Sequence, residues 1–310
     1  DDAPDDLVPA PVELPRVDVE IAAPTAYTPV GPDDYRCFLL DWPLDEVAFV
    51  TGFHAKPENL GIVHHIIAYR IAPTSVASYE DLDAADPEPG YTCFGGPGGS
   101  VTDFSAGQWL GAWAPGGGAS PYPEGTGLRM EPGSKVVLQI HYNTASGASG
   151  SDRSAIELMT APTVDREAFM LLWANPDWIF GDMPIPAGKP DATHQFEYDP
   201  TAALDLLTDV VPPNQPFLLH SSSHHMHLLG QQAEHMLLRG DGSETCLLQI
   251  PHWDFGWQMA YRFDEPVLVE PGDRLRLTCQ WDNSAGQADV NWGEGTGDEM
   301  CLAIFYASSP

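Results

Sequence analysis

Hydrophobic residues along this chain occur in short runs that turn-forming residues interrupt. The chain has 29 Gly and 30 Pro, and turn signals recur about every ten residues. Between them lie β-type runs such as GIVHHIIAYRI, SKVVLQIHYNT and PFLLHSSSHHMHLLG. Helical periodicity is nearly absent, and only Ala203–Thr208 suits a short helical turn. The pattern predicts an all-β protein of the sandwich or jelly-roll type.

The length suits two domains of ordinary size. The flexible segment Ser146–Ser154 predicts a boundary near the middle of the chain. We therefore expect an acidic, Pro-rich N-terminal arm over 1–24, a first β-sandwich over 25–155 and a second over 156–310. The arm should be either a disordered tether or a segment lying along a sheet edge. The Gly-rich segment 95–125 should form loops over one sandwich.

The charge balance excludes several classes of partner. The chain has 45 acidic and 13 basic residues, a formal net charge of −32. This charge repels nucleic acid and anionic membrane surfaces. No run reaches the roughly 18 apolar residues of a membrane span, and the first residues do not resemble a signal peptide.

The cysteines indicate the compartment. Five occur, at positions 37, 93, 246, 279 and 301, without CxxC spacing. Such spacing argues against zinc ribbons and thioredoxin-type chemistry and favours disulfides in an oxidising compartment. We expect a secreted, periplasmic or cell-surface protein with one cysteine left over.

Two histidines in the HHMH run have the spacing of metal ligands. In a strand, residues i and i+2 point to the same face about 6–7 Å apart, so His225 and His227 can converge on one ion. His224 and Met226 then point to the other face. A polar edge strand without a metal is the alternative interpretation. For His220 and His224, exposure to solvent is favoured over a role near a metal.

Three further candidates lie elsewhere in the chain. His64 and His65 are adjacent within an apolar run, so both can reach one ion only at a bulge or a strand end. Taken alone, His141 suits a satisfied core histidine and Met300 suits core packing. Together with histidines, however, a thioether selects copper over zinc or magnesium.

These residues resemble the copper type II ascorbate-dependent monooxygenases, in four blocks in the same order. The blocks are AFVTGFHAKPENLGIVHHIIAYRI, QWLGAWAPGGG with LRMEPGSKVVLQIHYNT, HMHLLG and DEMC. The resemblance covers about Tyr35 to Tyr306. We expect a microbial member of the family, with two tandem antiparallel jelly-roll domains facing each other across a cleft.

The resemblance implies two copper ions per chain. His64, His65 and His141 would hold the electron-transfer copper, and His225, His227 and Met300 would form the catalytic site for oxygen. Gln139 and Tyr142 flank His141 and could support it. The resemblance also implies disulfides Cys37–Cys93 and Cys279–Cys301, which leaves Cys246 as a buried thiol or an intermolecular link.

The implied activity is hydroxylation of an activated C–H bond of a small organic substrate by O2, with ascorbate or a similar one-electron donor. In the peptide-amidating branch an arginine, an asparagine and a tyrosine hold the substrate carboxylate. Here those positions are Ser223, Leu302 and Ile304. A charge-assisted clamp is therefore missing, and we expect a less polar substrate than a glycine-extended peptide.

Other classes of function remain open from the sequence. A copper-binding or copper-storage protein of the same fold would bind the metal without consuming oxygen. A jelly-roll lectin or adhesion module would have incidental histidines. A zinc hydrolase is disfavoured, because no motif places a carboxylate as general base and methionine is a poor zinc ligand.

Overall fold

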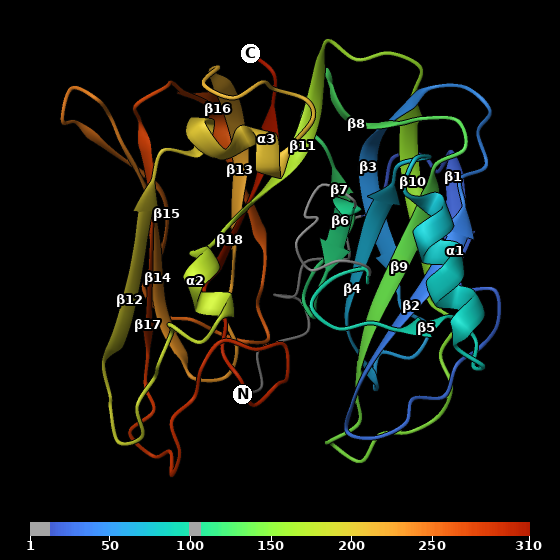
Figure 1. The fold of residues 1–310 in the computed structure, drawn as a ribbon, viewed down its shortest axis with the longest axis horizontal. Helices are drawn as coiled ribbons and strands as arrows, with labels where there is room; N and C mark the ends of the chain where they lie inside the picture. Colours follow the sequence, from blue (N-terminus) through green and yellow to red (C-terminus); the bar gives the residue numbers. More distant parts are fainter. Residues whose placement is uncertain (1–12, 99–106) are drawn as a thin grey trace.

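The computed structural model describes residues 13–98 and 107–310, and the chain is built mostly of β-sheet. Two β-rich halves stand side by side, the N-terminal half in blue to green and the C-terminal half in yellow to red (Figure 1). The all-β prediction is confirmed. The jelly-roll connectivity and the cleft between the domains remain predictions.

The described residues of the first half form ten strands and one helix: β1 (Val19–Ala22), β2 (Asp33–Asp41), β3 (Ala48–Lys56), β4 (Val63–Ile71), α1 (Val76–Ala85), β5 (Tyr91–Thr92), β6 (Gly107–Trp113), β7 (Ser120–Pro121), β8 (Thr126–Met130), β9 (Lys135–Asn143) and β10 (Ala155–Ala161). Strands β5-β2-β9-β4-β6 form one sheet in that order. This sheet packs over a core that includes Phe38, Ile66 and Leu138.

The second half contains β11 (Arg166–Trp173), α2 (Pro176–Ile179), β12 (Ala192–Tyr198), η2 (Pro200–Ala203), α3 (Leu204–Leu207), β13 (Phe217–His225), β14 (Gly230–Leu238), β15 (Glu244–Ile250), β16 (Ala260–Val269), β17 (Arg274–Trp281) and β18 (Leu302–Ser308). Strands β12-β17-β14-β15 form a separate sheet. A second core, with Phe217, Trp281 and Phe305, lies in this half.

One large sheet runs through both halves. Its strand order is β1-β10-β3-β8-β11-β18-β13-β16, and β7 pairs with β3 at its side. The parallel pair β8–β11 joins the part from the first half to the part from the second half. The two cores are therefore connected by hydrogen-bonded backbone.

Strand β10 begins at residue 155, the last residue of the predicted first domain, and so crosses the predicted boundary. It pairs with β3 and with β1, and its Ile156 and Leu158 belong to the first core. The division into 25–155 and 156–310 stays a prediction. In the part of the N-terminal arm that the structure describes, β1 lies at a sheet edge. This is the second of the two alternatives expected for the arm.

Two sequence-based expectations about local structure were wrong. Helix α1 was not predicted, because it has good helix formers but no apolar stripe, and it buries only Tyr79. In the segment 95–125, expected to be loop, Gly107–Trp113 forms strand β6 and pairs with β4; residues 99–106 of that segment lie outside the described residues. Alternation in β6 is masked by its glycines and tryptophans.

Candidate metal centre

A bulge brings three histidines of the first half together. Strands β4 and β9 are antiparallel partners, and His65 lies opposite His141. The register shifts between Val63 and His65, so His64 is the extra residue and can turn toward the same side as His65. Ligand atoms of His64, His65 and His141 all lie within 4.8 Å of one another.

The hydrogen bonds of His141 determine which of its nitrogens is free. Its Nε2 lies 2.8 Å from Oδ1 of Asp33, and a carboxylate can only accept, so Nε2 carries the hydrogen. Partial burial raises the pKa of Asp33, but bonds from His141, Thr296 and Asn143 bring it below its usual value overall. The lone pair of His141 is therefore on Nδ1, 3.0 Å from Nδ1 of His64.

Burial keeps these imidazoles neutral. It lowers the pKa of His64 to about 4, with further lowering from His141. Burial lowers the pKa of His65 and of His141 as well. Among the described residues, Nε2 of His64 is a buried nitrogen without a hydrogen-bond partner. At neutral pH the cluster consequently offers uncharged nitrogen donors, the form that metal ions bind.

The second cluster follows from plain strand alternation. His225 is the last residue of β13, and His227 follows two positions later. His225 Nδ1 lies 2.7 Å from Oε1 of Gln258, and His227 Nδ1 lies 3.0 Å from the carbonyl oxygen of Asp298. Both oxygens accept, so both Nδ1 atoms carry hydrogen. The Nε2 lone pairs then face each other at 3.1 Å.

Two lone pairs at that distance repel unless a cation or a proton lies between them. Protonation is disfavoured, because burial lowers the pKa of His225 to about 3 and that of His227 to about 4. Gln258 is itself fixed by a bond from its Nε2 to the carbonyl of Phe255, 2.9 Å. The arrangement is therefore suited to a metal ion.

Met300 lies just before β18, the strand that pairs with β13. The antiparallel pair β13–β18 ends with His225 opposite Leu302, and Met300 precedes Leu302 by two residues. Met300 is 5% exposed. Its neighbour Glu299 is fully buried and accepts bonds from the backbone nitrogens of His227 (2.9 Å) and Leu229 (2.6 Å).

One aromatic ring contacts a histidine of each cluster. The ring of Phe255 stacks on His64, with centroids 5.0 Å apart and an interplanar angle of 23°. It meets His227 edge-on at 6.3 Å and 86°. The two clusters thus lie close together, although they come from different halves of the chain.

Family models match most of the chain. The N-terminal domain of the copper type II ascorbate-dependent monooxygenases matches residues 19–149, and the C-terminal domain of the same family matches residues 190–309. The chain belongs to this family. Its oxidoreductase, monooxygenase and copper chemistry therefore describes the general class of this protein.

Curated relatives agree with the family assignment. The chain is 27% identical to peptidylglycine alpha-amidating monooxygenase from Rattus norvegicus over 90% of this chain and 26% of that protein. It is 27% identical to dopamine beta-hydroxylase from Homo sapiens over 92% of this chain and 45% of that protein. Tyramine beta-hydroxylase from Caenorhabditis briggsae is 26% identical over 88% of this chain and 45% of that protein.

The chain therefore spans less than half the length of these relatives. Among solved structures, the major capsid protein P2 from bacteriophage PM2 covers 94% of this chain at 12% identity with a TM-score of 0.34, a likeness that supports no argument. In the described part of the chain, no helix is long and apolar enough to cross a membrane.

The donors present fit the copper of the family. Three neutral imidazoles make up the first cluster, and two imidazoles make up the second, with the buried Met300 just before β18 as the candidate thioether donor. Imidazole and thioether are nitrogen and soft sulfur ligands that suit copper. A carboxylate and two neutral oxygens orient the rings from behind, as metal-bound histidines require.

The suggested supporting residues Gln139 and Tyr142 form hydrogen bonds to other groups. Gln139 Nε2 donates to the carbonyl of Gly96, 2.6 Å, and Tyr142 donates to Asp152 Oδ2, 3.1 Å. Their role in the copper chemistry stays untested. The residues that contact the histidines from behind are Asp33, Gln258 and Asp298, which the sequence-based reasoning missed because they lie on distant segments without a periodic signal.

The expectation that His220 and His224 face solvent was wrong. They are 5% and 3% exposed. His224 is buried by alternation opposite to His225, whereas His220 lies at the register shift between Leu219 and Ser221 and packs beside Tyr306. His220 bonds to Ser308 Oγ at 2.9 Å. His224 Nδ1 lies 2.9 Å from Nε2 of His235, so these rings satisfy each other inside the second core.

Both disulfides implied by the resemblance are present. Cys37 bonds to Cys93 and Cys279 to Cys301. Cys246 is unpaired and exposed, so the buried-thiol alternative is wrong: the residue lies on the outer face of β15. An intermolecular link through this thiol stays a prediction.

Proposed function

We propose that the protein is a copper-dependent monooxygenase that hydroxylates an activated C–H bond of a small organic substrate. The oxidant is O2, and ascorbate or a similar one-electron donor supplies the electrons. Two copper ions bind per chain, one at His64, His65 and His141 and one at His225, His227 and Met300. The observation that carries the proposal is the pair of facing Nε2 lone pairs of His225 and His227.

Copper held at these donors would supply one-electron redox chemistry, by which O2, two electrons and two protons convert C–H into C–OH and water. The protein's own contribution is positioning. Asp33 fixes the ring of His141, and Gln258 fixes that of His225. Glu299 fixes the backbone that carries His227. Preorganised ligands of this kind lose little free energy to rearrangement when the metal changes oxidation state.

The surface beside the second cluster favours a substrate of low charge. Ser223 lies opposite Ile304 across β13 and β18, and His225 lies opposite Leu302. Ser223 Oγ already donates to the carbonyl of Ile304, 3.3 Å. These half-buried side chains present no cation, so they offer apolar contact instead of a carboxylate clamp.

The proposed location is outside the cytoplasm: secreted, periplasmic or on the cell surface. Two disulfides support an oxidising compartment. The net charge of −32 disfavours binding to nucleic acid and is compatible with a small-molecule substrate.

Copper stoichiometry and oxygen uptake together test the proposal. The metal-free protein is reconstituted with copper, dialysed and analysed for bound metal, with two ions per chain expected. Glu13, His54 and Glu157 also bring ligand atoms within 4.8 Å of one another, so His54→Gln serves as the control for binding outside the proposed sites. Fewer than one ion per chain contradicts the proposal.

The same preparation is then reduced, and O2 consumption is followed with a panel of uncharged and weakly polar substrates. Uptake that depends on a substrate, with stoichiometric hydroxylated product, is the expected result. Copper binding without substrate-dependent uptake across the panel instead identifies a copper-binding protein without turnover.

A further inference from the structure

A loop of the second half, residues 293–298, reaches the three-histidine cluster of the first half. The loop is closed by its own bonds: the amide of Asp298 donates to the carbonyl of Gly295 at 2.8 Å, and the amide of Gly295 donates to Oδ2 of Asp298 at 3.1 Å. A Cβ at Gly293 would lie 2.3 Å from that bonded oxygen, so only glycine fits without moving the carboxylate. These bonds fix the turn that carries Thr296.

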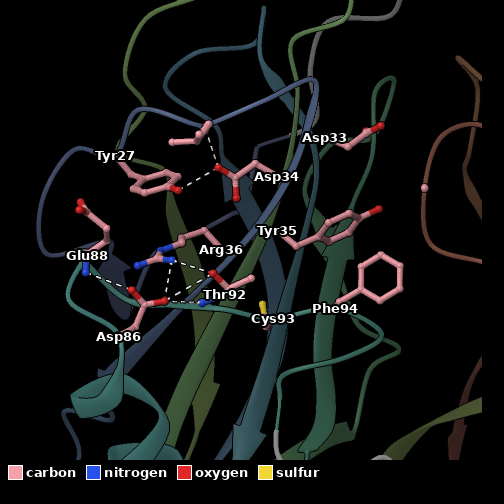
Figure 2. A pocket seen from close by; sticks show the side chains of 12 residues that line it. Tyr27, Asp33, Asp34, Tyr35, Arg36, Asp86, Glu88, Thr92, Cys93 and Phe94 are labelled. Atoms are coloured by element: carbon pink, nitrogen blue, oxygen red, sulfur yellow. Dashed lines mark hydrogen bonds and ion pairs between the residues drawn. The ribbon is translucent and has the colours of Figure 1, made fainter.

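Strand β2 presents two side chains to this loop. Figure 2 shows Asp33 and Tyr35 on one side of β2 and Arg36 on the other, as the alternation of a strand requires. The hydroxyl of Tyr35 donates to the carbonyl of Glu294. The hydroxyl of Thr296 donates to Oδ1 of Asp33 at 3.0 Å. The second half therefore touches two neighbours of the first cluster through a single loop.

Both contacts converge on His141. The ring of Tyr35 stacks on that of His141, with centroids 4.0 Å apart and an interplanar angle of 10°. Oδ1 of Asp33 accepts the Nε2–H of His141 at 2.8 Å and a bond from Nδ2 of Asn143 at 3.0 Å. Among the described residues, this one oxygen thus accepts from three donors. The donor that comes from the second half is the hydroxyl of Thr296.

The number of donors on a carboxylate oxygen determines how strongly it acts on each of them. A hydrogen bond to a carboxylate is charge-assisted and draws negative charge toward the donor. With its charge shared, Asp33 pulls less on the Nε2–H of His141. The imidazole is then a weaker electron donor at Nδ1, and a weaker donor stabilises Cu(II) less relative to Cu(I).

We propose that Thr296 is a positioning residue of the first copper site, supplied by the second half, and that its hydroxyl keeps the copper at this site easy to reduce. It acts through Asp33 and does not touch the metal. The site that receives electrons is then complete only when the second half is docked on the first. This inference rests on the proposed function, because it requires copper at His64, His65 and His141.

Other contacts hold the two halves together, so the loss of one hydroxyl does not separate them. The backbone of β8 pairs with that of β11. Arg70 of β4 lies 3.1 Å from a carboxylate oxygen of Asp209. The hydroxyls of Thr126 and Tyr306 are 2.9 Å apart. Thr126→Val is therefore a matched control: it removes a threonine hydroxyl between the halves that bonds to no residue of either cluster.

The test measures the reduction potential of the copper at the first site. The fully copper-loaded protein is titrated potentiometrically under argon, and the Cu(II) EPR signal is followed as the potential falls. The same titration of the full chain carrying His227→Ala, in which the second site has lost a ligand, identifies the signal that belongs to the first site.

Thr296→Val keeps the shape of the side chain but places a methyl group where the hydroxyl was. His141 and Asn143 still hold Asp33, so its charge acts more strongly on His141. We expect the ratio of Cu(II) to Cu(I) affinity at the first site to rise about fivefold, which lowers the reduction potential by about 40 mV for one electron. Thr296→Ala should shift it in the same direction, whichever way valine packs.

Two variants separate this role from a purely structural one. Thr296→Ser restores the hydroxyl and should have the reduction potential of the wild type. Thr126→Val should also leave the potential unchanged. An equal shift in Thr126→Val would assign the effect to the docking of the halves in general and contradict the proposal, as would a shift in Thr296→Ser as large as that in Thr296→Val.

The two proposals fail in different ways. If the wild type binds no copper at His64, His65 and His141, the proposed function is wrong. If copper binds there, but its reduction potential in Thr296→Val and Thr296→Ala equals or exceeds that of the wild type, the positioning role of Thr296 is wrong and the proposed function is unaffected.

Discussion

The two histidine clusters differ in what stands behind their imidazoles. His141 donates to a carboxylate, Asp33, whereas His225 and His227 donate to neutral oxygens. A carboxylate partner makes an imidazole a stronger donor and favours the more highly charged metal ion. Neutral partners, together with a thioether, favour the lower charge. The comparison shows how hydrogen bonds can assign different redox preferences to similar ligands.

The clusters also differ in backbone geometry. The second uses regular alternation at the end of β13, while the first needs a bulge to bring neighbouring residues to one side. A regular strand positions i and i+2 through its own pleat. A bulge depends on the partner strand, here β9, so the first cluster is sensitive to packing of the whole sheet.

The largest effect should come from the thioether. Met300→Ile keeps the volume but removes the sulfur that distinguishes the second cluster. We expect substrate-dependent O2 uptake to fall about a hundredfold or more, with copper at the first cluster retained. Met170→Ile, a half-buried methionine that packs against the first core, is the matched control. Unchanged uptake in Met300→Ile would falsify the assignment of this cluster as catalytic.

The next largest effect should come from Glu299, which holds the backbone at the second cluster. Glu299 accepts from the backbone nitrogens of His227 and Leu229 and from Nε1 of Trp281 at 2.8 Å. In Glu299→Gln an amide group faces these donors, so the free energy of unfolding should fall by about 3 kcal/mol. Chemical denaturation of the metal-free protein measures it, and the exposed Glu265→Gln should change little. Equal denaturation midpoints for Glu299→Gln and wild type contradict this account.

Acid should lower the free energy of unfolding of the second half through the buried pair His224 and His235, which lies outside the two clusters. Burial lowers the pKa of His235 to about 3, below the roughly 6.5 expected when unfolded. Below pH 6.5 the unfolded chain binds a proton that the folded chain does not, so stability is lost as the pH falls. From pH 6.5 to 5 the loss is about 2 kcal/mol for one such group.

The test compares denaturation midpoints at pH 7 and pH 5. His235→Gln removes the titrating ring but keeps hydrogen-bonding atoms toward Ser222 and His224, which bond to His235 at 2.7 and 2.9 Å. We expect the difference between the two pH values to shrink. A difference as large as in wild type shows that other groups govern the acid sensitivity.

The smallest effect tests the contrast between the partners directly. In Asp33→Asn the ring of His141 faces a neutral group, so copper affinity at the first cluster should fall about tenfold. Competition with a chelator, followed by EPR, measures it. Asp298→Asn is the matched change at the second cluster, because Asp298 contacts His227 through its backbone oxygen and should leave affinity there unaltered. Equal losses in both variants would remove the proposed distinction.

Strand content and the spacing of His225 and His227 could be predicted, because period-two alternation is local in the sequence. The bulge at His64 could not, since it is defined by register against β9. Asp33 and Gln258 come from remote segments, and only tertiary packing brings them to His141 and His225. Helix α1 was missed for a related reason: it packs through one side chain and leaves no periodic pattern.

The sheet that runs through both halves has a consequence for how the chain reaches its native state. Strand β10 completes the first core from beyond residue 155, and β8 pairs with β11. The edge of β3 is therefore paired by a strand that extends beyond residue 155, and the edge of β11 is paired by a strand of the first half. Dominated by contacts between distant residues, such a topology folds slowly, and a fragment ending at residue 155 would expose the edge of β3 to other chains.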